Sequence, residues 1–61
     1  MKRREFLRHL AGEGCQVLRE GGKHTVFFNA HNRKTSTVPR HTEIDDYLAG
    51  LICRQLGIPP I

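Results

Sequence analysis

The sequence contains no long hydrophobic run, no tryptophan and only two cysteines. No apolar stretch approaches the roughly 20 residues that a membrane span needs, and the charged start at Lys2 to Glu5 leads into an amphipathic segment rather than the apolar core of a signal peptide. Cys15 and Cys53 lie far apart and outside any CxxC spacing, so two reduced, buried thiols are expected rather than a disulfide scaffold. These absences predict a cytoplasmic protein with no membrane association.

The length of 61 residues predicts a single domain covering residues 1–61. A domain of this size buries only roughly 60% of its unfolded surface, so its core is small. A large internal substrate pocket is therefore not expected. Any site should lie on the surface or in a shallow groove, which favours a polymeric or macromolecular partner.

Charge is distributed unevenly along the chain, which has a net charge of +4. Residues 1–40 carry nine Lys/Arg and three Asp/Glu, whereas residues 41–61 carry one Arg and three Asp/Glu. A basic front of this kind favours a polyanion such as nucleic acid, although many small basic proteins bind none. The cations expected to contact phosphates are Lys2, Arg3, Arg4, Lys23, Arg33, Lys34 and Arg40.

The first two thirds of the chain predict one helix and three short strands. An apolar stripe that includes Phe6 and Leu10 predicts a helix over residues 2–13, ended by Gly12 or Gly14 in the left-handed conformation. Strands are expected over 15–20, over 24–29 and over 34–38. The connections are a Gly21-Gly22 reversal that exploits positive φ and a polar turn over 30–33. Pro39 ends the third strand because it cannot donate to a ladder, so the three strands form an antiparallel meander.

A second helix follows, with Thr42 expected as its N-cap and Asp45 as the reciprocal acid of a capping box. Gly57 should end it, and the prolines that follow prevent its continuation. Its apolar residues recur with helical period, at Ile44, Tyr47, Leu48, Leu51, Ile52 and Leu56. Two helices on one face of a three-stranded antiparallel sheet give an α+β fold of order α-β-β-β-α.

His24 is the leading candidate for proton chemistry. It stands beside Lys23 at the mouth of a strand, directly after the reversal, and imidazole exchanges protons near neutral pH. It shares strand parity with Val26 and Phe28, which would make it core-facing if those residues enter the core. A solvated surface histidine is the plainer interpretation.

The other histidines have weaker claims. His9 is expected on the helix surface and His31 in a turn, while a neutral, hydrogen-bonded structural role is favoured for His41. The spacing of His24, His31, His41 and the cysteines matches no zinc pattern, so neither a metal nor a cofactor is expected.

Several segments, in this order, resemble the HicA-type toxins, which are small bacterial mRNA interferases. These segments are Gly12-Glu13-Gly14-Cys15, Gly22-Lys23-His24, Thr37-Val38-Pro39-Arg40-His41 and the closing 48–58 stretch. The resemblance covers nearly the whole chain and implies a fold like the double-stranded-RNA-binding domain. The catalytic histidine of the family maps onto His24. Lys23 departs from the family, which most often has serine there.

The resemblance implies a metal-independent endoribonuclease that cleaves mRNA and is silenced by a HicB-type antitoxin. His24 would take the proton from a 2′-hydroxyl and Lys23 would stabilise charge on the phosphate, with the general acid unassigned. One alternative is a non-catalytic RNA-binding module of the same fold. Another is an interaction protein in which a partner completes the apolar face of the second helix.

Overall fold

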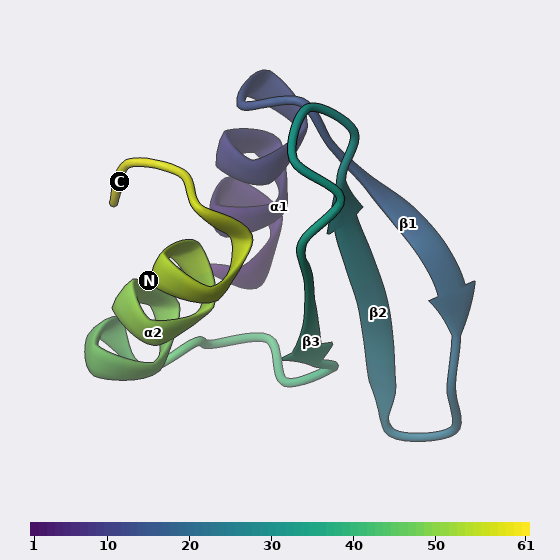
Figure 1. Ribbon diagram of the computed structural model, residues 1–61. Coiled ribbons are helices and arrows are strands. Elements are labelled where there is room, and N and C mark those ends of the chain that lie inside the picture. The colour runs from purple at the N-terminus through teal and green to yellow at the C-terminus, as the bar shows by residue number, and fades with distance from the viewer.

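The computed structural model describes residues 1–61. Its elements are, in chain order, α1 (Arg3–Gly12), β1 (Cys15–Glu20), β2 (His24–Asn29), β3 (Thr35–Pro39) and α2 (Asp46–Leu56). The strands form one antiparallel sheet in the order β1-β2-β3, and both helices lie against the same side of it (Figure 1). This arrangement confirms the predicted α-β-β-β-α fold, which resembles the double-stranded-RNA-binding domain. None of its helices has both the length and the apolar character that crossing a bilayer requires.

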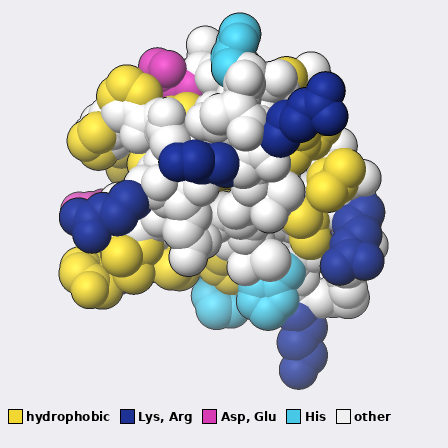
Figure 2. All heavy atoms as spheres, in the orientation of Figure 1, with side chains coloured by type: hydrophobic (Ala, Val, Ile, Leu, Met, Phe, Trp, Pro, Cys, Tyr) yellow, Lys and Arg dark blue, Asp and Glu magenta, His cyan; other side chains and the backbone are white.

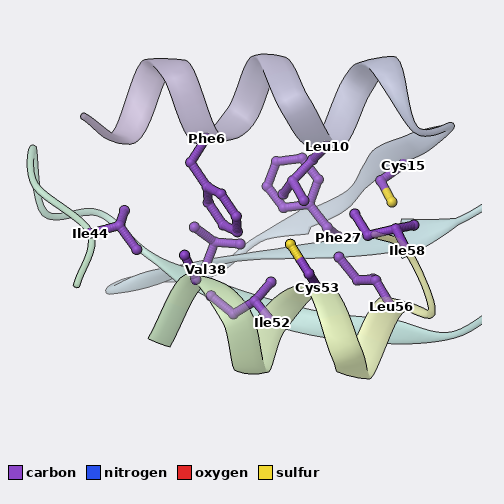
Figure 3. Packing of buried hydrophobic residues seen from close by; sticks show 11 residues of the cluster. Phe6, Leu10, Cys15, Phe27, Val38, Ile44, Ile52, Cys53, Leu56 and Ile58 are labelled. Atoms are coloured by element: carbon purple, nitrogen blue, oxygen red, sulfur yellow. The ribbon is translucent and has the colours of Figure 1, made fainter. Parts of the chain in front are cut away.

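The core lies between the two helices and the inner face of the sheet (Figure 3). Phe6 and Leu10 of α1 are fully buried and point toward side chains of α2 and the sheet, as Figure 3 shows. The cluster comprises Phe6, Leu10, Cys15, Phe27, Val38, Ile44, Ala49, Ile52, Cys53, Leu56 and Ile58. Both cysteines are buried and free, as predicted, and burial raises the pKa of each thiol.

The start of α2 differs from the prediction. Asp45 is the N-cap, with its carboxylate accepting a hydrogen bond from the backbone N–H of Leu48 at 3.2 Å. Thr42 instead belongs to a segment that pairs with the beginning of the chain, because its carbonyl accepts from Arg3 N at 2.8 Å and Ile44 N donates to the Met1 carbonyl at 2.8 Å. The predicted N-cap at Thr42 is therefore wrong, and Ile44 enters the core from this segment rather than from the helix.

The end of α2 agrees with the prediction and is held by the β2–β3 turn. Gly57 adopts the left-handed conformation, with φ of 69°. The side-chain amides of Asn29 and Asn32 both donate to the carbonyl of Leu56, at 2.9 and 3.0 Å. A Cβ on Gly57 would lie 2.6 Å from the Asn32 amide nitrogen, so a larger residue would displace this contact.

Left-handed residues occur at two further turns. Gly14, after α1, has φ of 86°, which confirms the expected glycine stop. In the β2–β3 turn, the residue with positive φ is Arg33, at 65°, and not its neighbour Asn32, although asparagine tolerates that conformation more readily. The Oδ1 of Asn32 accepts a hydrogen bond from Lys34 N at 2.8 Å, and its Nδ2 donates to the Leu56 carbonyl. Asn32 therefore contributes to this turn through its side-chain hydrogen bonds and not through a positive φ.

Candidate nucleic-acid interface

Strand β2 separates the two faces of the sheet residue by residue. Thr25, Phe27 and Asn29 are buried beneath the helices. The alternate residues, Val26 and Phe28, are half-buried on the opposite face, and His24 shares their parity and is exposed. The core-facing orientation considered for His24 is therefore wrong: the parity holds, but its face is the one that points to solvent.

The β1–β2 hairpin fixes the backbone of His24. The N–H of Gly21 donates to the His24 carbonyl at 2.8 Å, and a Cβ on Gly21 would lie 3.0 Å from that oxygen. Neither Gly21 nor Gly22 has positive φ, so the expected use of left-handed glycine in this reversal is wrong. Gly21 serves by the absence of a side chain, which lets the His24 carbonyl approach closely.

A hydrogen-bonded network ties this hairpin to α1 and to the end of β3. The guanidinium of Arg3 donates to the Pro39 carbonyl at 2.9 Å and to the Thr25 hydroxyl at 3.2 Å. Thr25 in turn donates to the Glu20 carboxylate at 2.7 Å. Arg40 donates to the same carboxylate at 2.6 Å and to the Gly21 carbonyl at 2.6 Å. Because Pro39 is the cross-strand neighbour of His24, the network braces the end of the sheet that carries the imidazole.

A groove of about 460 Å³ opens beside this end of the sheet. Four of its six lining residues are cationic and none is acidic, a composition that suits a phosphate backbone. The lining residues are Lys2, Arg3, Arg4, Leu7, Arg40 and Thr42, and we call this hollow the basic groove. Leu7 and Thr42 were not predicted to line a groove, because no sequence pattern placed them beside the cations.

The seven cations expected to bind RNA divide into two groups in the structure. Lys2 forms an ion pair with Glu43 at 2.8 Å, which raises the pKa of the lysine and lowers that of the carboxyl, while Arg3 and Arg40 are engaged in the network. The remaining four are exposed and form no ion pair: Arg4, Lys23, Arg33 and Lys34. The second group is the freer to meet a ligand.

The other histidines are placed differently from one another. His9 is half-buried, with its Nε2 within 2.8 Å of the Pro59 carbonyl. The ring of His31 packs over Gly14, since a Cβ there would lie 2.7 Å from it.

His41 is exposed and its side chain forms no hydrogen bond, so the hydrogen-bonded role predicted for it is wrong. It follows Pro39 by two residues, and Pro39 is the cross-strand neighbour of His24. Figure 2 shows histidine side chains gathered at this end of the sheet, where β2 begins and β3 ends. The structure thus brings a second solvated imidazole to the end of the sheet that carries His24.

No three His, Cys, Asp or Glu side chains lie close enough together to hold a metal ion. The ionisable groups at this end of the sheet are imidazoles, ammonium and guanidinium groups, and the Glu20 carboxylate that Thr25 and Arg40 already engage. Such a set can exchange protons near neutral pH and can neutralise the charge of a phosphodiester.

Comparison with known proteins gives one result. No curated protein and no solved structure shows significant similarity to the chain. Residues 3–58 match the family described as the HicA toxin of bacterial toxin-antitoxin systems, which is nearly the whole of the 61-residue sequence. The match spans every helix and strand and includes the hairpin that presents His24. The chain belongs to the HicA toxin family.

Proposed function

We propose that this toxin is a metal-independent endoribonuclease that cleaves mRNA, with His24 as its catalytic residue. The observation that carries the proposal is the exposed imidazole of His24 at a braced end of the sheet, beside a groove lined by cations. A binding module would need the basic groove but would have no use for a proton-exchanging group held at the same end of the sheet.

The proposed reaction needs no group that the chain lacks. His24 takes the proton from a ribose 2′-hydroxyl, and the 2′-oxygen attacks the adjacent phosphorus. The P–O2′ bond forms as the P–O5′ bond breaks, which leaves a 2′,3′-cyclic phosphate on one fragment. Lys23, exposed and next in sequence, offers its ammonium group to the charge that builds on the phosphate oxygens.

The departing 5′-oxygen must receive a proton. His41 suits this role better than the sequence suggested, because it is solvated, free of hydrogen bonds and located two residues after the neighbour of His24. An imidazole pair can divide the work, one member acting neutral as the base and the other protonated as the acid.

The family also implies an antitoxin partner, and we propose a HicB-type protein that covers this end of the molecule. A stable interface buries about 800 Å² on each partner, a large share of a total surface of 4178 Å². An occupant of that size centred on His24 would shield both the imidazole and the basic groove. Co-expression of such a partner should relieve growth arrest and give a complex without ribonuclease activity.

The direct test is incubation of the purified protein with a long single-stranded RNA in the presence and absence of EDTA. Cleavage should continue in EDTA and leave a 2′,3′-cyclic phosphate or its hydrolysis product. His24→Ala should reduce the rate by about 10²- to 10⁴-fold, the usual contribution of a positioned general base. Activity that disappears in EDTA and returns with magnesium would refute this mechanism.

A matched control is His31→Ala, which removes an exposed imidazole at the opposite end of the sheet. That variant should cleave at the rate of the unmodified protein. If His24→Ala cleaves normally, His24 is not the catalytic residue. If the unmodified protein binds RNA but does not cleave it, the protein is a binding module instead.

A further inference from the structure

We propose that the outer face of the sheet is the track on which a single RNA strand lies, with one unpaired base stacked on Phe28. The inference deepens the proposed function and rests on its RNA substrate, since it assigns the strandedness of that substrate and a contact away from the cleaved bond. It concerns the face that the two helices leave uncovered.

The outer face carries no negative charge. The register places Gln16 and Arg19 of β1 beside Phe28 and Val26 of β2, and β3 contributes only threonines and a proline to this face. Every carboxylate of the chain lies elsewhere, at Glu5, Glu13, Glu20, Glu43, Asp45 and Asp46. Glu20 belongs to the inner side, where it binds the Thr25 hydroxyl. The face is therefore electrostatically open to a polyanion.

A hollow of about 340 Å³ lies on this face around an aromatic ring. Phe28 is half-buried in it, and Leu18, which is 54% exposed, is the aliphatic side chain beside it. Leu18 reaches this side because the register of β1 shifts between Val17 and Arg19, which places an extra residue in the strand. Figure 2 shows hydrophobic side chains over β1 and β2 bordered by Lys or Arg side chains.

Arg33 supplies a cation to the same hollow. Its φ of 65° is uncommon for any residue other than glycine, so an arginine kept in that conformation carries local backbone strain. An aromatic ring, an aliphatic neighbour and a guanidinium without an acidic partner form a set that binds a nucleobase and its phosphate.

The hollow and His24 lie on one line. His24, Val26 and Phe28 occupy alternate positions of β2 on the same face, so Phe28 is about 13 Å from His24 along the strand at 3.3 Å per residue. A strand leaving the basic groove would pass His24 and continue over Val26 to Phe28. A base inside a duplex is already stacked on its neighbours, whereas an unpaired base is free to stack on Phe28. The contact would therefore favour single-stranded RNA and place the cut near the bound base.

The test uses short 2′-O-methyl RNA oligonucleotides, which lack the attacking hydroxyl and so report binding without cleavage. Phe28→Leu should weaken single-strand binding by about 5- to 150-fold, equivalent to the 1–3 kcal/mol of one stacked base. Tyr47→Leu is the matched control, because it removes an aromatic ring that is 76% exposed on α2, and it should bind like the unmodified protein. An abasic site moved along the oligonucleotide should reduce binding strongly at one position, and Phe28→Leu should abolish that position dependence.

A second variant guards against loss of fold. Arg33→Asn removes the charge and places a residue that tolerates positive φ, so it should melt no lower than the unmodified protein while the salt slope of binding falls by about 0.7. Arg54→Gln removes one charge from α2 and should leave that slope unchanged. Unchanged single-strand binding by both Phe28→Leu and Arg33→Asn would overturn the proposal. So would a Phe28→Leu protein that keeps RNA affinity but loses its antitoxin, because the face would then be a protein interface.

These outcomes separate the track from the catalytic proposal. If His24→Ala cleaves normally but the abasic scan depends on Phe28, the track stands and the assignment of the base falls. If His24→Ala is inactive but the position of the abasic site affects binding in no variant, the catalytic proposal stands and the proposed RNA track is wrong.

Discussion

The two faces of β2 differ in what surrounds them, although neighbouring residues supply both. Phe27 is 5% exposed and packs among buried side chains of the helices, whereas the side chains of His24 and Phe28 on the other face have no helix above them. The inner face is closed by the protein itself. The outer face is left with rings, cations and threonine hydroxyls, which is the chemistry of a surface that meets a ligand.

This difference predicts which substitutions should affect stability and which should affect RNA binding and cleavage. Substitutions on the inner face should affect the free energy of unfolding and leave the chemistry of folded molecules unchanged. Substitutions on the outer face and at the end of the sheet should do the reverse. Each variant below tests that separation, beginning with the largest expected effect.

Phe27→Ala should lower the free energy of unfolding by about 3–5 kcal/mol, because it removes a buried ring and leaves a cavity in a small core. His24→Ala, three residues away and exposed, should change it by less than about 0.5 kcal/mol. Urea denaturation followed by circular dichroism measures both. Equal destabilisation by the two variants would show that the faces are not separate.

His41→Gln should slow cleavage by about 10²-fold if the imidazole protonates the leaving oxygen. RNA affinity should change much less than the cleavage rate, since the protonated imidazole is one cation among the several expected to meet the phosphate backbone. Single-turnover cleavage rates, combined with fluorescence anisotropy of bound RNA, distinguish the two effects. A variant that cleaves normally would remove His41 from the mechanism and leave Lys23 as the candidate acid.

Arg3 and Arg4 are neighbours in the basic groove with different attachments. Arg3→Gln should cost about 1–3 kcal/mol of stability, because it leaves the Pro39 carbonyl and the Thr25 hydroxyl short of a donor. Arg4→Gln should leave stability unchanged and lower the salt slope of RNA binding by about 0.7. Thermal melts and affinity titrations over a range of salt give the two readouts, and an interchange of the effects would contradict the assignment.

Alkaline pH should produce the smallest effect. Burial raises the pKa of Cys15 and Cys53 above the ordinary 9.0, so the folded state holds their protons more tightly than the unfolded state does. This contribution to stability is complete below pH 9 and is lost as pH rises through the folded-state values. Denaturation midpoints from neutral pH upward should fall less steeply in Cys53→Ala than in the unmodified protein. Parallel curves would show that other groups cause the loss.

The order of elements was predictable because its signals are local. Gly57 ends α2, Pro39 ends β3, and the apolar period of α2 reads correctly through Ile52 and Leu56. The start of α2 was not predictable in this way. Thr42 satisfies every local rule for a cap, yet its carbonyl is used by Arg3, far away in sequence. Long-range pairing of the backbone overrode a local preference.

The candidate site was predictable in part. The position of His24 at the mouth of a strand followed from the glycines, but its direction did not, because both parities of β2 contain apolar residues. Only the placement of the helices decides which parity is covered. The lack of hydrogen bonds at the His41 side chain could not be predicted either. It depends on α2 beginning at Asp46 rather than next to His41.

The double amide contact at the Leu56 carbonyl has a consequence during synthesis. Every residue of the proposed RNA surface precedes α2 in the chain, but Asn29 at the end of β2 and Asn32 in the following turn bind the last carbonyl of that helix. Much of the core also comes from α2 and Ile58. A nascent chain that has exposed His24 to the cell therefore still lacks the frame that positions it. The toxin should become competent only after α2 has left the ribosome.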